Sequence, residues 1–288
     1  MKITVIGGSG FLGSHVADRL SKDGHEVIIF DQEESKWKKN NQEMIIGDIL
    51  KIEELEKAIS KSQIVYNFAA VADLEDALFK PIKTANVNIL GTLNALELCK
   101  KHSVERFVFA STIYVYSLDG NFYRCSKQSA ESFIEEYNKL YNLNYTILRY
   151  GSIYGPRSDN TNGLYKIIEA ALDKDQIIYE GDKESRREYI HVEDAAEASV
   201  KILEESFKNQ NIILTGTQSL KVYDIMKMIS EILGIENLKF VEKKGTGHYI
   251  RTPYTYQPRI AKKYIPNIHY DLGQGLIQLI EEIKKEKN

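Results

Sequence analysis

The stretch Gly7-Gly8-Ser9-Gly10-Phe11-Leu12-Gly13 decides the fold, because it joins an apolar strand pattern at Lys2–Ile6 to a helical pattern at Phe11–Lys22. Its glycines satisfy the spacing G-x-G-x-x-G, which permits a tight turn, a close approach of the backbone to a pyrophosphate, and packing of the helix on the strand. The helix N-terminus then offers free N–H groups and a partial positive charge to phosphates. We predict that this loop binds a dinucleotide through Gly7, Gly10, Phe11, Leu12 and Gly13; the alternative is a plain strand-to-helix turn.

Strands and helices continue to alternate beyond this loop. The apolar runs of strand length are Lys2–Ile6, Glu26–Phe30, Glu43–Ile46, Ile64–Phe68, Arg106–Ala110 and Tyr145–Leu148. Alternation of this kind predicts an α/β fold, a Rossmann-like doubly wound parallel sheet covered by helices on both faces. Ligands of such sheets bind at the carboxyl ends of the strands.

The pattern changes near Gly151, where a Gly155-Pro156 turn, a polar loop and a helical segment at Leu164–Leu172 precede a mixture of short elements. We expect residues 1–150 to form a cofactor-binding Rossmann domain that carries the catalytic residues. Residues 151–288 are expected to form a smaller, substrate-binding C-terminal lobe, with the chain crossing between the two.

The bulk composition is that of an ordinary soluble protein. The chain has 288 residues, a formal net charge of −3, 43% hydrophobic residues and 27% charged residues. This balance gives no electrostatic reason to expect nucleic-acid or membrane binding, and no apolar run approaches the ~18 residues of a membrane span. The chain opens directly into a strand pattern, so we expect no signal peptide. Cys99 and Cys125 have no metal-type spacing, so we expect no metal site and a reducing, cytoplasmic setting.

Asp31 ends the second apolar run at a distance from the glycine loop that suits a ribose-binding residue. A carboxylate there accepts hydrogen bonds from the ribose hydroxyls and repels a 2′-phosphate, which favours NAD over NADP. Lys36, Lys38 and Lys39 lie nearby in the sequence and would weaken that preference. The alternative is that Asp31 only ends a strand.

Tyr123 and Lys127 form a catalytic candidate pair at the start of a helical pattern. Positions i and i+4 share a helix face, so the phenol and the ammonium point the same way. A phenolate at neutral pH requires a pKa about three units below the usual value near 10, and a cation about 4 Å away supplies roughly that at an effective dielectric near 20. An oxidised nicotinamide would add to this shift. The spacing recurs at Tyr179 and Lys183, but in a non-helical setting.

Spaced motifs along nearly the whole chain resemble the extended short-chain dehydrogenase/reductase family, the NAD-dependent nucleotide-sugar epimerases and dehydratases. Besides the glycine loop and Tyr123-Lys127, they are Gly47-Asp48-Ile49, Asn67-Phe68-Ala69-Ala70, Asn88–Thr92, Tyr154-Gly155-Pro156-Arg157 and Arg187–Asp194. The resemblance implies that NAD contacts Asp48, Ile49, Phe68, Ala69, Ala70 and Asn88. It places Thr112 as the catalytic hydroxyl that holds the substrate beside the phenol. His191 is a tempting base, but the family uses this histidine structurally.

A nucleotide-diphosphate sugar substrate needs partners for its phosphates, and the planar fork of arginine suits them. The resemblance places Arg187 and Arg251 as these arginines. The match at Arg251 is looser, because Thr255–Arg259 replaces the motif that usually follows. Ser152 stands where the family usually has an asparagine that contacts the sugar phosphate.

The residues after Thr112 narrow the reaction. Dehydratases of this family carry Asp-Glu there and decarboxylases usually carry a Glu, whereas this chain has Ile113 and Tyr114. The interpretation that remains is a 4-epimerase acting on a UDP-hexose-like substrate, in which Tyr123 removes and returns the proton of the C4 hydroxyl. The alternatives are a nucleotide-sugar 4-reductase or dehydrogenase, a 4,6-dehydratase, and a non-catalytic NAD sensor.

Two further features concern the pocket and the assembly. Only ten residues separate Thr112 from Tyr123, so the loop 117–122 is short and leaves the sugar pocket more open or suited to unusual substrates. Helical patterns near Thr84–Lys101 and Arg124–Tyr141 carry apolar residues on more than one face, and in the family such helices pair across a dimer. We expect a homodimer; buried core is the alternative.

Overall fold

The computed structural model describes residues 1–241, 248, 250, 262–264 and 270–287. Within these residues an eight-stranded sheet has the order β14-β11-β6-β5-β4-β1-β2-β3, and each neighbouring pair is parallel. Its strands are β1 (Lys2–Ile6), β2 (Glu26–Asp31), β3 (Gln42–Ile46), β4 (Ile64–Asn67), β5 (Arg106–Thr112), β6 (Tyr145–Tyr150), β11 (Gln210–Leu214) and β14 (Lys262–Lys263).

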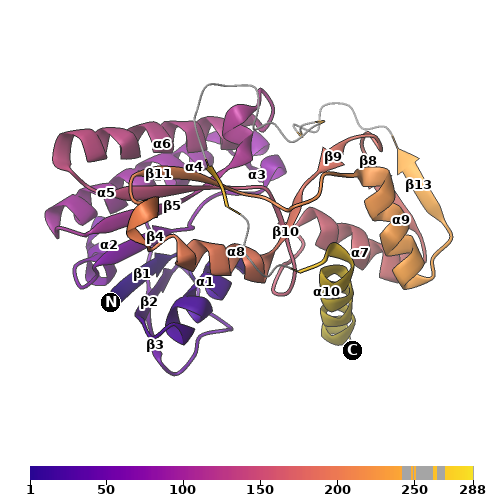
Figure 1. The fold of residues 1–288 in the computed structure, drawn as a ribbon, viewed down its shortest axis with the longest axis horizontal. Helices are drawn as coiled ribbons and strands as arrows, with labels where there is room; N and C mark the ends of the chain where they lie inside the picture. Colours follow the sequence, from indigo (N-terminus) through magenta and orange to yellow (C-terminus); the bar gives the residue numbers. More distant parts are fainter. Residues whose placement is uncertain (242–247, 249, 251–261, 265–269, 288) are drawn as a thin grey trace.

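Helices cover both faces of this sheet (Figure 1). On one face, α1 (Phe11–Lys22) and α8 (Val192–Lys201) pack on strand residues such as Ile3 and Val5. On the other face, α2 (Ile52–Ile59), α5 (Gly91–Lys101) and α6 (Asn121–Tyr141) pack on residues such as Ile6 and Phe109. Alternate residues of one strand therefore belong to two different cores, which explains why the strands appear as continuous apolar runs. The predicted doubly wound α/β fold is confirmed.

The strand order reverses between β1 and β4, since the chain after β1 builds β2 and β3 on one side and the chain after β4 builds β5 and β6 on the other. The two central strands end at Ile6 and Asn67, which are register partners. Loops that leave such a point in opposite directions open a crevice at the carboxyl ends of the strands. The predicted strands are found in place, but β2, β5 and β6 continue to Asp31, Thr112 and Tyr150 because their parallel partners extend that far. β3 begins one residue earlier, at Gln42, and β4 ends one residue earlier, at Asn67.

The helix predicted near Thr84–Lys101 contains a local widening. The structure has α4 (Pro81–Ala85), then the π-helical turn η1 (Asn86–Leu90), then α5. A π turn places one extra residue in the coil and re-aims the side chains within it. Asn88, inside this turn, is buried. Gly91 follows because a Cβ there would lie 2.8 Å from Cγ2 of Ile49.

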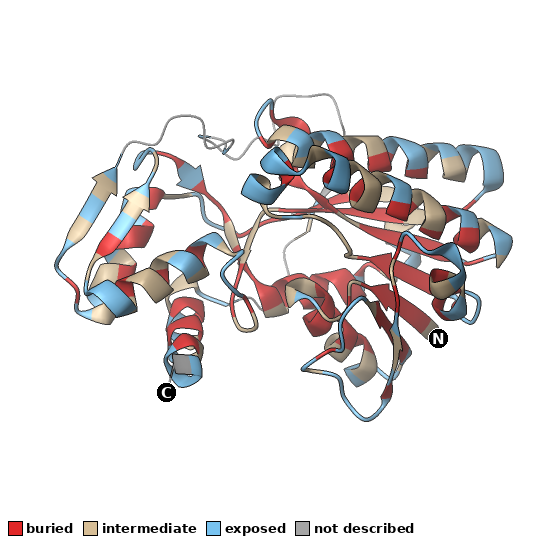
Figure 2. Cartoon of the chain, turned by 180° about the vertical axis from the view of Figure 1, so that it is seen from behind, coloured by how far each residue is buried: buried red, intermediate tan, exposed pale blue. Residues whose placement is uncertain are grey.

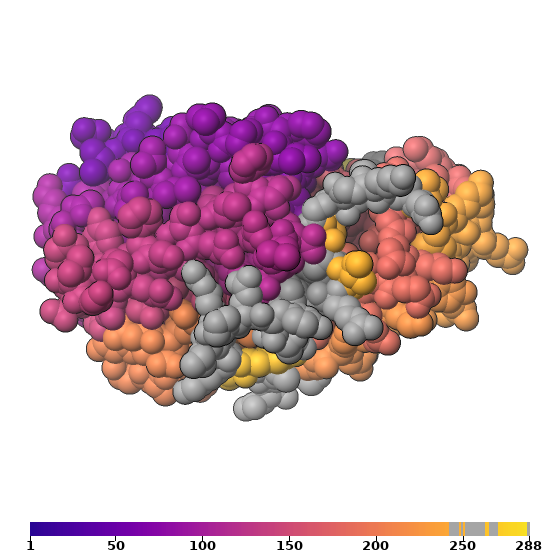
Figure 3. Space-filling model, turned by 90° about the horizontal axis from the view of Figure 1, so that it is seen from above, coloured from indigo at the N-terminus to yellow at the C-terminus, as the bar shows by residue number. Residues whose placement is uncertain are grey.

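A smaller lobe follows Gly151 and has a separate apolar core. It contains β7 (Ser152–Tyr154) paired with β10 (Tyr189–His191), β8 (Ile177–Glu180) paired with β13 (Leu238–Val241), β9 (Arg186–Arg187) paired with β12 (Leu220–Lys221), and the helices α7 (Gly163–Lys174), α9 (Val222–Leu233) and α10 (Leu272–Lys287). Seen from above, this lobe lies at one end of the larger part (Figure 3).

The same C-terminal half returns to the large sheet, because β11 adds beside β6 and α8 packs against α1. The expected division at residue 150 stays a prediction, and the chain does cross between the two parts. Figure 2 shows buried residues concentrated in the strands and on the inner faces of the helices. Among the helices of the described ranges, none combines the length and apolarity that a bilayer crossing requires.

Candidate active site

The glycine loop packs against the loop that follows β4. Gly7 has φ +78°, and a Cβ there would lie 2.5 Å from the backbone nitrogen of Ala69. A Cβ on Gly13 would lie 2.1 Å from the carbonyl oxygen of Gly7. Glycine is therefore required at both positions, once for backbone conformation and once for the close approach of α1 to β1. The loop has the geometry expected of a dinucleotide cradle.

Asp31 lies beside this loop. Its carboxylate accepts a hydrogen bond from the backbone N–H of Ser9 at 2.9 Å, so the side chain is held against the glycine loop. Asp31 lines a cavity of about 270 Å³, whose other predicted members are Gly7, Gly10, Ile49, Phe68, Ala69 and Ala70. The predicted contact of Asp31 with the ribose of NAD stays a prediction, and its position on the cavity wall agrees with it.

The lysines near Asp31 take different positions from those expected. Lys36 and Lys38 are exposed and do not line the cavity. Lys39 forms an ion pair with Asp18 at 3.2 Å. Lys83, which the sequence did not single out, lines the cavity instead.

Asp48 and Asn88 do not line the cavity, although both were predicted to contact the cofactor. Asp48 accepts a hydrogen bond from the N–H of Leu50 and closes a local turn. Asn88 exchanges two hydrogen bonds with the backbone of Val71, at 2.7 and 3.1 Å, and donates a third to Ser126. Asn88 therefore joins the loop after β4 to helix α6, which positions the cavity wall.

A larger cavity of about 460 Å³ adjoins the first, since both are lined by Gly7, Gly10, Phe68 and Ala70. It contains Phe11, Leu12 and Gly13 of the glycine loop together with Thr112, Tyr123 and Lys127. The structure thus brings the predicted catalytic and pyrophosphate-binding residues to one crevice at the carboxyl ends of β1, β4, β5 and β6.

Tyr123 lies in the first turn of α6, where the Asn121 side chain caps its backbone N–H at 3.1 Å. Burial raises the pKa of Tyr123 to about 12, while a hydrogen bond with the Thr112 hydroxyl acts in the opposite direction. The expectation that Lys127 alone brings this pKa toward neutrality is therefore wrong for the protein without bound ligands. The hydrogen bond with Thr112 is the one influence that lowers this pKa, and desolvation outweighs it.

Lys127 is 2% exposed. Its Nζ donates a hydrogen bond of 2.7 Å to the carbonyl of Ala110 and lies 5.8 Å from the ring centroid of Tyr123. Burial lowers the pKa of Lys127 to about 7, and the negative charge of Glu131 counteracts this shift. The charged and the neutral form of the Lys127 amine are therefore both populated near pH 7.

The predicted substrate-binding residues on the smaller lobe do not line either cavity. Ser152 lies on β7 with a half-buried side chain. Arg187 is buried on β9, and its Nη1 donates to the carbonyl of Arg186 at 2.9 Å. Arg251, the looser of the two arginine predictions, lies outside the described residues.

Several residues that sequence reasoning missed line the larger cavity. They include Asp73 after β4 and the loop residues Asp159, Thr161 and Asn162. Asn162 caps α7 by accepting from the N–H groups of Leu164 and Tyr165. The one available signal was an N-cap residue before a helical pattern. Such a signal marks a helix start and does not indicate a substrate contact.

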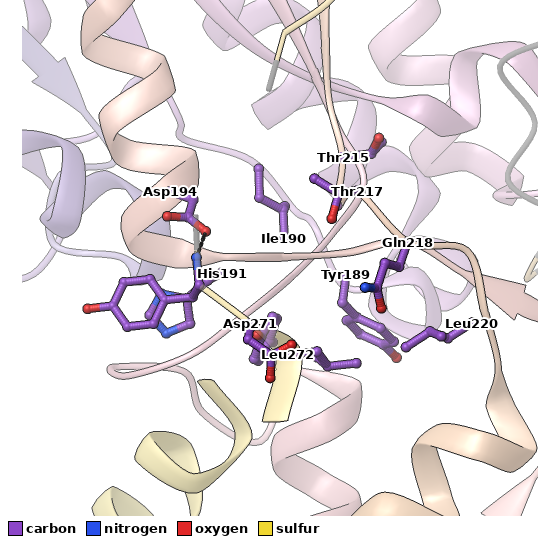
Figure 4. Close-up of a pocket in the computed structure, with 13 residues that line it drawn as sticks. Tyr189, Ile190, His191, Asp194, Thr215, Thr217, Gln218, Leu220, Asp271 and Leu272 are labelled. Carbon is purple, nitrogen blue, oxygen red and sulfur yellow. Dashed lines mark hydrogen bonds between the residues drawn. The ribbon is translucent and has the colours of Figure 1, made fainter. Parts of the chain in front are cut away.

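A separate cavity of about 130 Å³ lies under the smaller lobe, between β10, the segment after β11, and the start of α10 (Figure 4). None of the predicted site residues lines it. His191, one of its lining residues, stacks on Tyr270 with ring centroids 4.1 Å apart. Burial lowers the pKa of His191 to about 4, so the ring is neutral near pH 7. These contacts agree with the structural interpretation of this histidine.

Comparison with known proteins agrees with the fold. The model of the NAD dependent epimerase/dehydratase family matches residues 3–216. The chain belongs to this family, and the predicted family and NAD cofactor are confirmed.

Similar proteins cover the whole chain. A candidate UDP-glucose 4-epimerase of Methanocaldococcus jannaschii is 29% identical over 98% of both chains. The UDP-glucuronic acid decarboxylase 2 of Arabidopsis thaliana is 30% identical over 99% of this chain and 68% of that protein. Among solved structures, the UDP-glucose 4-epimerase of Thermotoga maritima with UDP-glucose superposes with a TM-score of 0.87 at 26% identity, over 100% of both chains.

The contact between Gly13 and Gly7 generates a stability prediction. We expect Gly13→Ala to lower the free energy of unfolding by about 2 kcal/mol or more, since its methyl group would overlap a backbone oxygen that cannot move independently. Gly10→Ala is the matched control, because a Cβ there meets only the oxygen of Gly7 at 3.4 Å and φ is −77°. Urea unfolding followed by circular dichroism measures both. Equal stability of the two variants would contradict the proposed packing.

Proposed function

We propose that the protein is an NAD-dependent 4-epimerase of nucleotide-diphosphate sugars, with a UDP-hexose-like substrate. The observation that carries this proposal is the convergence of Thr112, Tyr123 and Lys127 on the cavity that the glycine loop also lines. The similar proteins of Methanocaldococcus jannaschii and Thermotoga maritima support the choice of reaction.

The residues present fit the cofactor. Side chains at Gly7 and Gly13 would overlap neighbouring backbone, so the loop keeps the bare backbone that a pyrophosphate can approach. Asp31 lies where it can bind ribose hydroxyls. Ile49, Phe68, Ala69 and Ala70 would form the wall around the adenosine part. When bound, NAD supplies reversible oxidation of the C4 carbon.

Each catalytic side chain has one task in this proposal. The phenolate of Tyr123 takes the proton of the C4 hydroxyl as a carbonyl forms at C4, and the phenol returns that proton after the sugar has turned over. The hydroxyl of Thr112, which already hydrogen-bonds the phenol, orients the C4 oxygen. The ammonium of Lys127 stabilises the phenolate, and it does so in a water-excluded setting where one charge has a large effect.

The environment of Thr112 supports epimerisation over elimination of water. Ile113 is buried among Val115, Tyr116 and Ile213 and does not line the cavity. Tyr114 lies edge-on against Tyr123, and its hydroxyl shares a hydrogen bond of 2.7 Å with His248. Neither residue offers the carboxylate that a dehydratase places after its catalytic threonine. No observation favours the reductase or the non-catalytic sensor, and the sensor would have no use for Tyr123 and Lys127 in one cavity.

The charge of the cavity wall supports a neutral sugar. Asp73 and Asp159 line the larger cavity, and among its described lining residues Lys127 is the sole cation. Lys127 donates a hydrogen bond to the carbonyl of Ala110 and lies over the ring of Tyr123. A sugar carboxylate placed here would face the like charge of Asp159 and that of Asp73, which is paired with Lys166 at 3.6 Å. Like charges are unfavourable in a partly enclosed site. We infer that a neutral hexose is preferred to a uronic acid.

Binding of the diphosphate is assigned to Arg187 and Arg251, with Ser152 near the sugar phosphate, as the family resemblance implies. Arg187 is a buried arginine on β9 of the smaller lobe, and the planar fork of arginine suits a diphosphate. The diphosphate would then bridge the two parts of the molecule.

We also infer a cytoplasmic homodimer. Large apolar side chains are exposed on α3 (Leu74–Phe79), α4, η1 and α6, and α6 contacts the other three. The members of this apolar face are Phe79, Ile82, Leu90 and Phe133, which are 73%, 74%, 51% and 41% exposed. Exposed apolar surface of this extent is typical of a protein–protein interface. Cys99 and Cys125 are free thiols, in keeping with a reducing compartment.

The substrate class is tested by incubating the protein with NAD and a panel of UDP-, GDP-, CDP- and dTDP-hexoses and UDP-glucuronic acid, and by following C4 inversion with NMR. We expect inversion of a neutral hexose, at least about tenfold faster than any reaction of the uronic acid. Loss of water or carbon dioxide without inversion would contradict the proposed reaction.

Removal of the phenol oxygen tests the role of Tyr123. We expect Tyr123→Phe to lower kcat by at least about 10³-fold, within the usual range for a missing acid–base group, and to leave NAD affinity within about threefold. Tyr137→Phe is the matched control, because Tyr137 lies on the same helix but bonds Glu97 away from the crevice. Turnover of Tyr123→Phe at the rate of the control would overturn the mechanism.

The apolar face predicts the oligomeric state. The wild-type protein should elute at about twice its chain mass of 33.0 kDa, and Phe133→Glu should elute as a monomer because it would bury a charge in the interface. Ile277→Glu changes an equally exposed residue on α10 and should remain a dimer. Size-exclusion chromatography with light scattering distinguishes these cases, and a dimeric Phe133→Glu would show that this face is not the interface.

A further inference from the structure

A buried ion pair lies directly behind the catalytic lysine. Glu131 follows Lys127 by one helical turn on α6, and its side chain is 0% exposed. Arg149 of β6, also 0% exposed, donates from Nε to Oε1 at 2.9 Å and from Nη2 to Oε2 at 2.8 Å. The Ser111 hydroxyl of β5 donates to Oε1 at 2.6 Å. Both carboxylate oxygens are therefore held in place from the strands beneath the crevice.

The groups around Lys127 come from four elements. On α6 they are Tyr123 and Glu131. From β5 the carbonyl of Ala110 accepts its hydrogen bond, and the ring of Phe109 lies 4.7 Å from Nζ. Beyond Glu131 lie Arg149 of β6 and Tyr116 of η2 (Ile113–Tyr116), which are joined by a hydrogen bond of 2.5 Å. Lys127 and Arg149 are the two buried cations of this group. Among the described residues around them, Glu131 is the one carboxylate.

We propose that Glu131 is a positioning residue that keeps Lys127 charged, and that Arg149 tunes this effect by sharing the carboxylate. The inference rests on the proposed function of Lys127. Arginine does not lose its proton in proteins, so any excess positive charge in this group must be relieved at the lysine. Burial already lowers the pKa of Lys127 to about 7, so a modest change in the neighbouring charge alters its protonation near neutral pH.

The two members of the ion pair have opposite effects on Lys127. Loss of the negative charge at Glu131 leaves two cations together, so the pKa of Lys127 should fall. Loss of the positive charge at Arg149 removes the other cation that shares the Glu131 carboxylate. The carboxylate then stabilises the ammonium of Lys127 more strongly, so the pKa of Lys127 should rise. The proposed reaction needs the phenolate together with the charged lysine, so it requires that bound NAD bring the pKa of Tyr123 below that of Lys127. Activity is then lost as pH rises through the pKa of Lys127. The alkaline limb of the pH profile should therefore move to lower pH in the first case and to higher pH in the second.

A purely structural ion pair would behave differently. Removal of either partner from a buried pair destabilises the fold, because the remaining charge is uncompensated. Both substitutions would then lower stability and activity in the same direction, without opposite displacements of the pH profile. The sign of the displacement separates the two roles.

The test compares Glu131→Gln with Arg149→Gln in the full chain with NAD. The ammonium of Lys127 is titrated by NMR of lysine labelled with ¹⁵N at Nζ, and its signal is assigned by its loss in Lys127→Arg. We expect its pKa to fall by about one unit or more in Glu131→Gln, as a charge several ångströms away at an effective dielectric near 20 requires. In Arg149→Gln the pKa should rise by a smaller amount, because Arg149 acts on the lysine through Glu131. The alkaline limb of kcat/KM should move with it.

If either single variant fails to fold, the double variant Glu131→Gln/Arg149→Gln removes the pair without leaving a lone charge. The pKa of Lys127 should still fall in it, since the charge of Glu131 acts directly on the lysine and that of Arg149 acts through Glu131. An unchanged titration of Lys127 in the folded variants would overturn the inference. The NMR titration needs no sugar, so it tests the inference even if the panel of nucleotide sugars gave no inversion, which would refute the proposed function instead.

Discussion

The contact between the glycine loop and the loop after β4 is the constraint on which the rest of the site depends. β1 and β4 are neighbours at the point where the strand order reverses, and their loops leave the sheet in opposite directions. Gly7 lets these loops touch at Ala69, and Gly13 lets α1 begin directly against them. The smaller cavity, which we propose holds the cofactor, is lined by both loops, and the larger cavity shares Gly7, Gly10, Phe68 and Ala70 with it. Side chains at either glycine would separate the elements that bring the two cavities together.

A second constraint is the cost of burying charge. Tyr123 and Lys127 lie in a crevice where burial disfavours the charged form of each, since it raises the pKa of the phenol and lowers the pKa of the amine. The protein counteracts this with fixed polar groups: the Thr112 hydroxyl toward the phenol, and the Ala110 carbonyl and Glu131 toward the lysine. Arg149 and Ser111 in turn hold Glu131 from the strands. The reactive groups are thus coupled to the sheet by electrostatics as well as by packing.

Most of the fold and the centre of the site could be predicted from the sequence, because local patterns determine them. Glycine spacing, apolar runs and the i, i+4 pair are visible within a few residues. The π turn at Asn88 and the inward bonds of that side chain could not be predicted, since they depend on Val71 and Ser126 from other elements. The same holds for Asp159, which reaches the cavity only through the fold of its loop. The raised pKa of Tyr123 could not be predicted either. The i, i+4 spacing indicates that the Lys127 cation is near, but it does not indicate how deeply the phenol is buried.

The central claim is that Tyr123 removes and returns the proton of the C4 hydroxyl while C4 is oxidised and then reduced again by the same bound cofactor. The most direct measurement uses UDP-glucose carrying deuterium at C4, incubated with the protein and NAD in ordinary water and followed by NMR. The account predicts an epimerised sugar that retains its deuterium at C4, with no reduced cofactor released. Exchange of the deuterium for solvent hydrogen, or one reduced cofactor released for each sugar consumed, would contradict it.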